Sequence, residues 1–223
     1  MTIQGRPLLR SRVMLVMLAG LAGCAGMGTQ PGNEVALADV RAKISLGRCD
    51  EGLIAGLNRT KAPELEQEAA YICLQQGQAQ AVDQLLADYS KRHRNGPHPD
   101  YSAYLLTLAQ QMRFELTLDD DLARLREGRE AHRRYADFAR SYPQSEYRAE
   151  VGPRLNALLE EMAQAEYRLA REAELAGDRQ SAEARMRYIA RYYPLSSVAR
   201  KVNDWLGEID QQDTAPVSPG TAW

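Results

Sequence analysis

Two segments of the chain are related by a shift of 51 residues, and this relation constrains the fold more than any other feature. In both segments a small residue is followed four and seven residues later by large apolar residues, and twelve residues later by proline. The first set is Ala131, Tyr135, Phe138 and Pro143, and the second is Ala182, Met186, Ile189 and Pro194. Spacings of four and seven mark one face of an α-helix, and proline cannot continue a helix. The shift therefore predicts two similar helical units, in which the small residue admits a neighbouring helix.

The chain from residue 34 to residue 212 has the composition and periodicity of helix throughout. Ala, Leu, Arg, Glu and Gln dominate, runs of β-branched residues are missing, and apolar residues recur at spacings of three and four. Glycines at positions 47 and 77 precede two further apolar helical patterns, which brings the number of helical pairs to about four.

These offsets resemble the second half of a tetratricopeptide repeat. The period exceeds the usual 34 residues because the first helices are long, notably the one expected over residues 145–176. We expect an all-α fold, a tetratricopeptide-like α-solenoid of about four helical pairs over residues 34–212. A compact helical bundle with chance proline spacing is the alternative.

Cys24 ends the sequence Leu21-Ala22-Gly23-Cys24, which follows three arginines and a short apolar run, as in a bacterial lipoprotein signal. The run is too short to span a bilayer but suits a cleaved signal peptide. We expect residues 1–23 to be removed and Cys24 to carry acyl chains such as palmitate, which anchor the protein stably. The alternatives are an ordinary signal peptide or a start codon placed too far upstream.

The two ends of the chain are expected to lie outside the folded body. Residues 24–33 are rich in glycine and read as a flexible tether, and residues 213–223 read as a flexible tail that contains proline. By resemblance to lipoprotein sorting rules, Ala25 favours the outer membrane, with the protein facing the periplasm.

Cys49 and Cys73 are expected to form a disulfide, because disulfides persist in the periplasm. If the chain turns near Lys61, both cysteines are 12 residues from the turn, and an antiparallel helix pair brings them level. Two buried free thiols are the alternative.

Charge and chemistry argue against nucleic-acid binding and catalysis. Without the three signal-peptide arginines, the chain has 25 basic and 30 acidic residues. The excess of positive charge that is typical of a nucleic-acid-binding protein is therefore missing. His93, His98 and His132 have no metal-ligand spacing with Cys, Asp or Glu, and the chain has no phosphate-binding glycine loop. We expect a non-enzymatic protein without catalytic residues, metal or cofactor.

Two charged runs have a structural and a functional interpretation each. Asp119-Asp120-Asp121 is read as a helix N-cap or solvated turn, with a cation site as the alternative. The run from Lys91 to Arg94 is read as a helix C-terminus, with lipid phosphates or an acidic partner as the alternative. Tyr192 and Tyr193 cannot both face the same side, so one of them is a candidate exposed anchor for a partner.

Three sequence stretches carry a resemblance to a known family. They are Gly96-Pro97-His98-Pro99-Asp100-Tyr101, then Tyr142-Pro143-Gln144-Ser145-Glu146-Tyr147, and then the pattern from Arg154 to Pro194. Together with the lipoprotein signal, they resemble the BamD family, also called YfiO or ComL. The resemblance covers residues 96–205 well and residues 34–95 weakly. Residues 58–65 replace the aromatic loop that the family usually carries after its first helical pair.

This resemblance implies a scaffold for the assembly and insertion of β-barrel proteins in the outer membrane, within a Bam complex. The implied partners are a BamA-like barrel subunit, other assembly lipoproteins and, through the lipid anchor, the membrane. The divergent N-terminal half leaves an alternative, a tetratricopeptide lipoprotein that scaffolds a secretin, pilus or polysaccharide exporter.

Overall fold

The computed structural model describes residues 31–214, and all the regular elements of this range are α-helices. The helices are α1 (Pro31–Ser45), α2 (Glu51–Thr60), α3 (Pro63–Gln75), α4 (Ala79–Leu86), α5 (Tyr89–Arg92), α6 (Pro99–Leu116), α7 (Asp121–Ser141), α8 (Arg148–Leu175), α9 (Arg179–Tyr192) and α10 (Ala199–Thr214). Helix α1 begins inside the segment expected as a tether, and α10 extends two residues beyond the expected end of the helical body.

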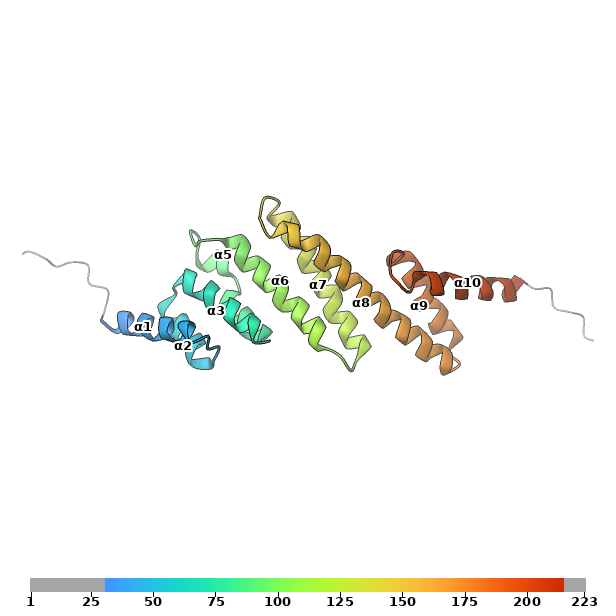
Figure 1. The fold of residues 1–223 in the computed structure, drawn as a ribbon, viewed down its shortest axis with the longest axis horizontal. Helices are drawn as coiled ribbons and strands as arrows, with labels where there is room; N and C mark the ends of the chain where they lie inside the picture. Colours follow the sequence, from blue (N-terminus) through green and yellow to red (C-terminus); the bar gives the residue numbers. More distant parts are fainter. Residues whose placement is uncertain (1–30, 215–223) are drawn as a thin grey trace, which may run out of the picture.

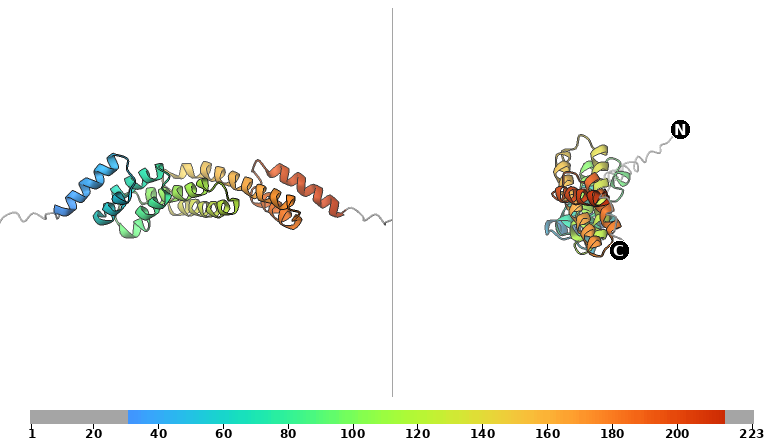
Figure 2. Two further views of the ribbon diagram at one scale, coloured as in Figure 1. Left: turned by 90° about the horizontal axis from the view of Figure 1, so that it is seen from below. Right: turned by 90° about the vertical axis from the view of Figure 1, so that its right-hand side faces the viewer.

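The helices form a solenoid of four antiparallel pairs, α1–α2, α3–α4, α6–α7 and α8–α9, which α10 closes. They follow one another along the long axis, with the first and last helices at opposite ends (Figure 1), and the view along this axis is narrow (Figure 2). The main helix contacts join members of one pair or of adjacent pairs. The predicted all-α, tetratricopeptide-like solenoid is confirmed, and so is the long first helix of the last pair, α8.

The repeated sequence set occupies equivalent places in the last two pairs. Ala131 and Ala182 have no exposed surface, and the large apolar residues that follow them are also buried, so the second helices α7 and α9 pack closely on their neighbours. The prolines stand just beyond the ends of α7 and α9. The packing predicted from the 51-residue shift is therefore correct.

Glycine makes the turn within three of the four pairs. Gly47, Gly77 and Gly177 follow α1, α3 and α8 with φ values of 62°, 75° and 79°, in the left-handed region where a side chain is strained. The α6–α7 turn has no such glycine and instead runs through residues 117–120, where the Asp120 carboxylate caps α7 by accepting from the Ala123 amide at 2.8 Å. The N-cap interpretation of the aspartate run is thus confirmed.

Helix α6 joins two hydrophobic cores. Leu105 and Ala109 of α6 belong to the core of α1–α4, whereas Tyr104 and Phe114 belong to the core of α7–α10. A helix with apolar residues on both sides can be buried on both sides. The two halves of the solenoid therefore share α6 as their seam.

Two buried glutamates cross-link helices inside the solenoid. Glu66 of α3 is 2% exposed and lies 2.8 Å from an Arg92 guanidinium nitrogen and 3.0 Å from His93 Nε2. Glu166 of α8 is 3% exposed and pairs with Arg129 of α7 at 3.1 Å and with Arg185 of α9 at 2.6 Å. The basic run 91–94 thus ends α5, as predicted. Two of its residues, Arg92 and His93, contact the buried carboxylate of Glu66.

We expect the paired substitution Arg129→Ala and Arg185→Ala to lower the free energy of unfolding by about 3–5 kcal/mol, because it leaves the buried Glu166 carboxylate without a partner. Urea unfolding followed by circular dichroism measures this loss. As the control, adding Glu166→Leu should restore most of the stability, since no buried charge then remains. A loss that persists in the triple variant would contradict this explanation.

Candidate protein-binding surface

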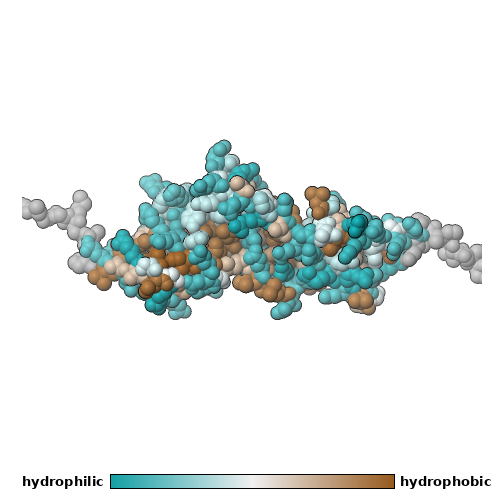
Figure 3. All heavy atoms as spheres, viewed as in Figure 1, coloured by the Kyte–Doolittle hydropathy of each residue, from teal (hydrophilic) through white to brown (hydrophobic). Residues whose placement is uncertain are grey.

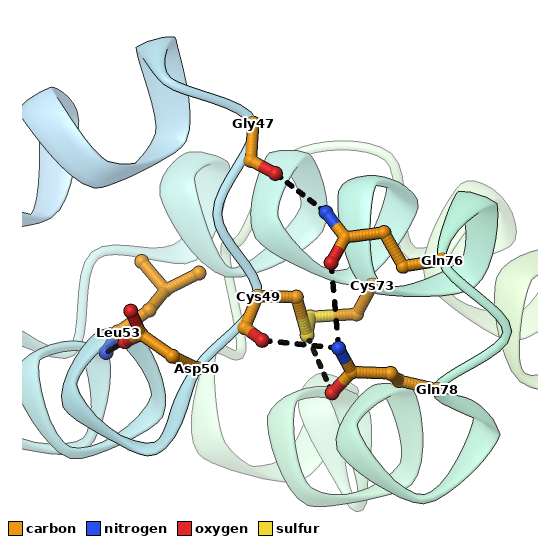
Figure 4. The surroundings of a disulfide bond; sticks show 7 residues. All are labelled: Gly47, Cys49, Asp50, Leu53, Cys73, Gln76 and Gln78. Carbon is orange, nitrogen blue, oxygen red and sulfur yellow. Dashed lines mark hydrogen bonds between the residues drawn. A yellow bond between two sulfur atoms is a disulfide. The ribbon is translucent and has the colours of Figure 1, made fainter.

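The predicted site residues lie at the N-terminal end of the chain. Cys24 lies outside the described residues. Cys49, in the α1–α2 turn, and Cys73, near the end of α3, have sulfur atoms 2.02 Å apart and Cα atoms 5.1 Å apart (Figure 4). The chain turns at Lys61, which has a φ of 49° and follows α2 directly. The turn on which the disulfide prediction rested is therefore in the expected place, and the covalent bond itself remains a proposal.

Glutamine side chains hold the α1–α2 turn against the α3–α4 turn beside these cysteines. The Gln78 amide nitrogen donates to the Cys49 carbonyl at 3.0 Å, and the Gln76 amide nitrogen donates to the Gly47 carbonyl (Figure 4). Asp50 caps α2 by accepting from the Leu53 amide at 2.8 Å. Hydrogen bonding to the Leu53 amide is the main cause that lowers the pKa of Asp50. Polar contacts thus join the first two pairs beside the two cysteines.

The sequence stretch at the start of α6 is held by a residue that sequence analysis did not single out. Gln67 of α3 is buried, and its amide nitrogen lies 2.8 Å from both the Pro97 carbonyl oxygen and Ser102 Oγ. Pro99 stands at the first position of α6, as expected. The buried amide anchors the entry to the seam helix.

Aromatic side chains of the 142–147 stretch join the third pair to the fourth. The rings of Tyr104 and Tyr147 stack with centroids 4.9 Å apart, and the Tyr104 and Phe138 rings lie 5.6 Å apart. Burial, together with the hydrogen bond to Glu150, raises the pKa of Tyr104 to about 12, so its hydroxyl stays protonated and donates. The tyrosines of this stretch therefore support the packing between pairs.

The segment after α9, which is equivalent to the 142–147 stretch after α7, lines a groove of about 360 Å³, which we call the C-terminal groove. It is lined by Asn156, Leu159, Glu160, Tyr192, Tyr193, Pro194, Leu195 and Ser196. Tyr193 is buried, whereas Tyr192 is 54% and Leu195 98% exposed. Figure 3 shows apolar atoms protruding at the upper edge, where Figure 1 places the α9–α10 turn. Of the two adjacent tyrosines, Tyr192 is thus the exposed one.

The groove is held in shape by its own contacts. Glu160 of α8 accepts a hydrogen bond from the Ser197 amide at 2.9 Å and another from its hydroxyl, and the hydroxyl bond is the main cause that lowers the pKa of Glu160. The Tyr192 ring lies 4.6 Å from the Tyr188 ring, and the Arg191 guanidinium lies 5.4 Å from the Tyr192 ring centroid. An aromatic side chain held in this way loses little entropy when a partner binds.

The family of the chain follows from comparison with known proteins. Residues 57–212 match the model of the YfiO family, which is described as outer membrane lipoprotein. The chain belongs to the YfiO family of outer membrane lipoproteins. The resemblance drawn from the sequence is confirmed, and the matched range runs from α2 to α10, including the C-terminal groove. No curated protein matches the chain.

Two further searches of the described residues add to this comparison. Within residues 31–214 no helix has both the length and the apolar character needed to cross a membrane. The same range contains no group of three or more His, Cys, Asp or Glu side chains placed to hold a metal ion.

We expect mass spectrometry of the unreduced, alkylated protein to find Cys49 and Cys73 in one cross-linked peptide. Replacing both by serine should lower the free energy of unfolding by about 3 kcal/mol, because the bond closes a loop of roughly 25 residues in the unfolded chain. Treating the unsubstituted protein with a reductant should produce the same loss. Alkylation of both thiols in the native protein would rule the disulfide out.

Proposed function

We propose that this YfiO-family protein is a lipid-anchored, non-enzymatic scaffold that faces the periplasm and supports the assembly of β-barrel proteins into the outer membrane. Its family supports the outer-membrane location, and the lipoprotein signal at Cys24 supports the anchor. Helix α1 begins seven residues after Cys24, and seven residues span at most about 25 Å, so the solenoid would stay close to the membrane surface.

The observation that carries the proposal is the C-terminal groove within the family-matched range. Partner-binding surfaces typically combine an apolar pocket with a rigid aromatic anchor, and Tyr192 beside Leu159 and Leu195 provides this combination. The one carboxylate in the groove, Glu160, is engaged by Ser197. The groove is therefore suited to holding a protein, and we propose a BamA-like barrel subunit as its occupant, with other assembly lipoproteins bound elsewhere on the solenoid.

We expect in-cell crosslinking of the native lipidated protein, followed by purification and mass spectrometry, to recover the BamA-like subunit. The paired substitution Tyr192→Ser and Leu195→Ser should reduce this recovery about tenfold, since it removes the aromatic and aliphatic anchors of the groove. Leu175→Ser is the matched control, because Leu175 is also strongly exposed but is the last residue of α8, and the α8–α9 turn lies at the opposite edge from the α9–α10 turn.

Either of two results would overturn the proposal. Recovery of a secretin, pilus or polysaccharide-export component in place of the barrel subunit would assign the scaffold to another envelope machine. Equal recovery of the barrel subunit with the groove variant and the control would remove the groove from the interaction.

A further inference from the structure

Three leucines are exposed at and beside the α6–α7 turn: Leu116 is the last residue of α6, Leu118 lies in the turn, and Leu122 is the second residue of α7. Leu116, Leu118 and Leu122 are 64%, 68% and 50% exposed, and we call this group the leucine tip. Several leucines exposed close together along the chain are typical of a surface that binds another molecule. The turn lies on the lower edge of the solenoid in Figure 1, and Figure 3 shows apolar atoms at the same place.

Polar contacts close this turn without help from the leucines. Thr117 Oγ1 donates to the Arg113 carbonyl at 2.8 Å, and the Asp120 carboxylate caps α7. An Arg124 guanidinium nitrogen donates to the Thr117 carbonyl at 3.2 Å. The other three pairs make the equivalent turn with a single glycine. The leucine tip is therefore additional to what the fold needs at this position.

Carboxylates surround the leucine tip. Glu115, Asp119 and Asp120 are exposed, and none of them has an ion pair among the described residues. Of the nearby arginines, Arg168 pairs with Asp121 and Arg124 with Glu161, whereas Arg126 is exposed further along α7, so residues 115–126 carry four carboxylates against two arginines. The local charge is thus negative, which opposes contact with an anionic lipid surface and favours a basic partner.

We propose that the leucine tip binds a basic amphipathic segment of a partner protein. Apolar side chains of that segment cover Leu116, Leu118 and Leu122, and its lysines or arginines face Glu115, Asp119 and Asp120. The α6–α7 turn lies on the edge opposite the α9–α10 turn in Figure 1, and the α9–α10 turn borders the C-terminal groove, so two partners can be bound at once. This inference does not depend on the function proposed above.

The first test uses the full chain in its own cells, with a photo-crosslinking amino acid at position 118 and, as the control, at position 46. Leu46 is 71% exposed in the α1–α2 turn, but it stands alone between the basic residues Lys43 and Arg48. We expect position 118 to crosslink to a protein segment that contains apolar residues together with lysine or arginine, in several-fold higher yield than position 46. A lipid adduct, an acidic or uncharged segment, or equal yields at the two positions would overturn the proposal.

The second test uses the purified chain and two synthetic amphipathic helices of about 18 residues, one of leucine and lysine and the other of leucine and glutamate. We expect the lysine peptide alone to bind, and about tenfold more weakly to Leu118→Ser/Leu122→Ser and to Glu115→Gln/Asp119→Asn. Leu46→Ser should bind as the unsubstituted protein does. Equal binding to all variants would overturn the proposal, and thermal melts exclude unfolding as the cause of a loss.

These variants leave Tyr192 and Leu195 unchanged. A negative result at the leucine tip therefore leaves the C-terminal groove untouched, and a negative result at the groove leaves the tip untouched.

Discussion

The structure depends on α6 being buried on both sides. Leu105 and Ala109 pack into the N-terminal core, and Tyr104 and Phe114 pack into the C-terminal core, so one helix completes two otherwise separate apolar clusters. In a solenoid each unit is stabilised by its neighbours, and the helix at a junction therefore sets the relative orientation of everything on either side of it. The buried Gln67, which holds the start of α6 through Pro97 and Ser102, fixes that orientation at one end.

Each half of the solenoid also contains one buried glutamate in the first helix of a pair. Glu66 binds Arg92 and His93, and Glu166 binds Arg129 and Arg185. A buried carboxylate contributes less to stability than well-packed apolar residues of similar size, but it tolerates only arrangements that keep its partners in reach. In α8 the partners come from the helix before and the helix after, so the glutamate fixes the register of three successive helices at once.

Much of the fold was readable from local patterns, because helix ends and apolar faces are encoded within a few residues. The 51-residue shift located equivalent helices, the turn near Lys61 from which the pairing of the cysteines was predicted is in the expected place, and Asp120 was readable as a cap. The pairing of Glu66 and Glu166 was not, since their partners lie 19 to 37 residues away and the composition does not tell a buried glutamate from an exposed one. The leucine tip and Leu195 were also missed, because composition does not tell an exposed leucine from a buried one. Their exposure depends on how the turns leave the helices, and only a leucine outside a periodic pattern could have indicated it.

The position of the two cysteines has a mechanical consequence. Cys49 precedes α2 and Cys73 lies near the end of α3, at a sequence separation of 24. If the two are bonded, tension applied from the N-terminal side would not pass through the chain between them. A pull applied at the N-terminal end could unravel α1 and the chain up to Cys49, after which the load would pass through the sulfur atoms into the last turn of α3. Helix α2 and most of α3 would then carry none of the force, so the first helical pair could lose α1 without loss of the helices that follow it.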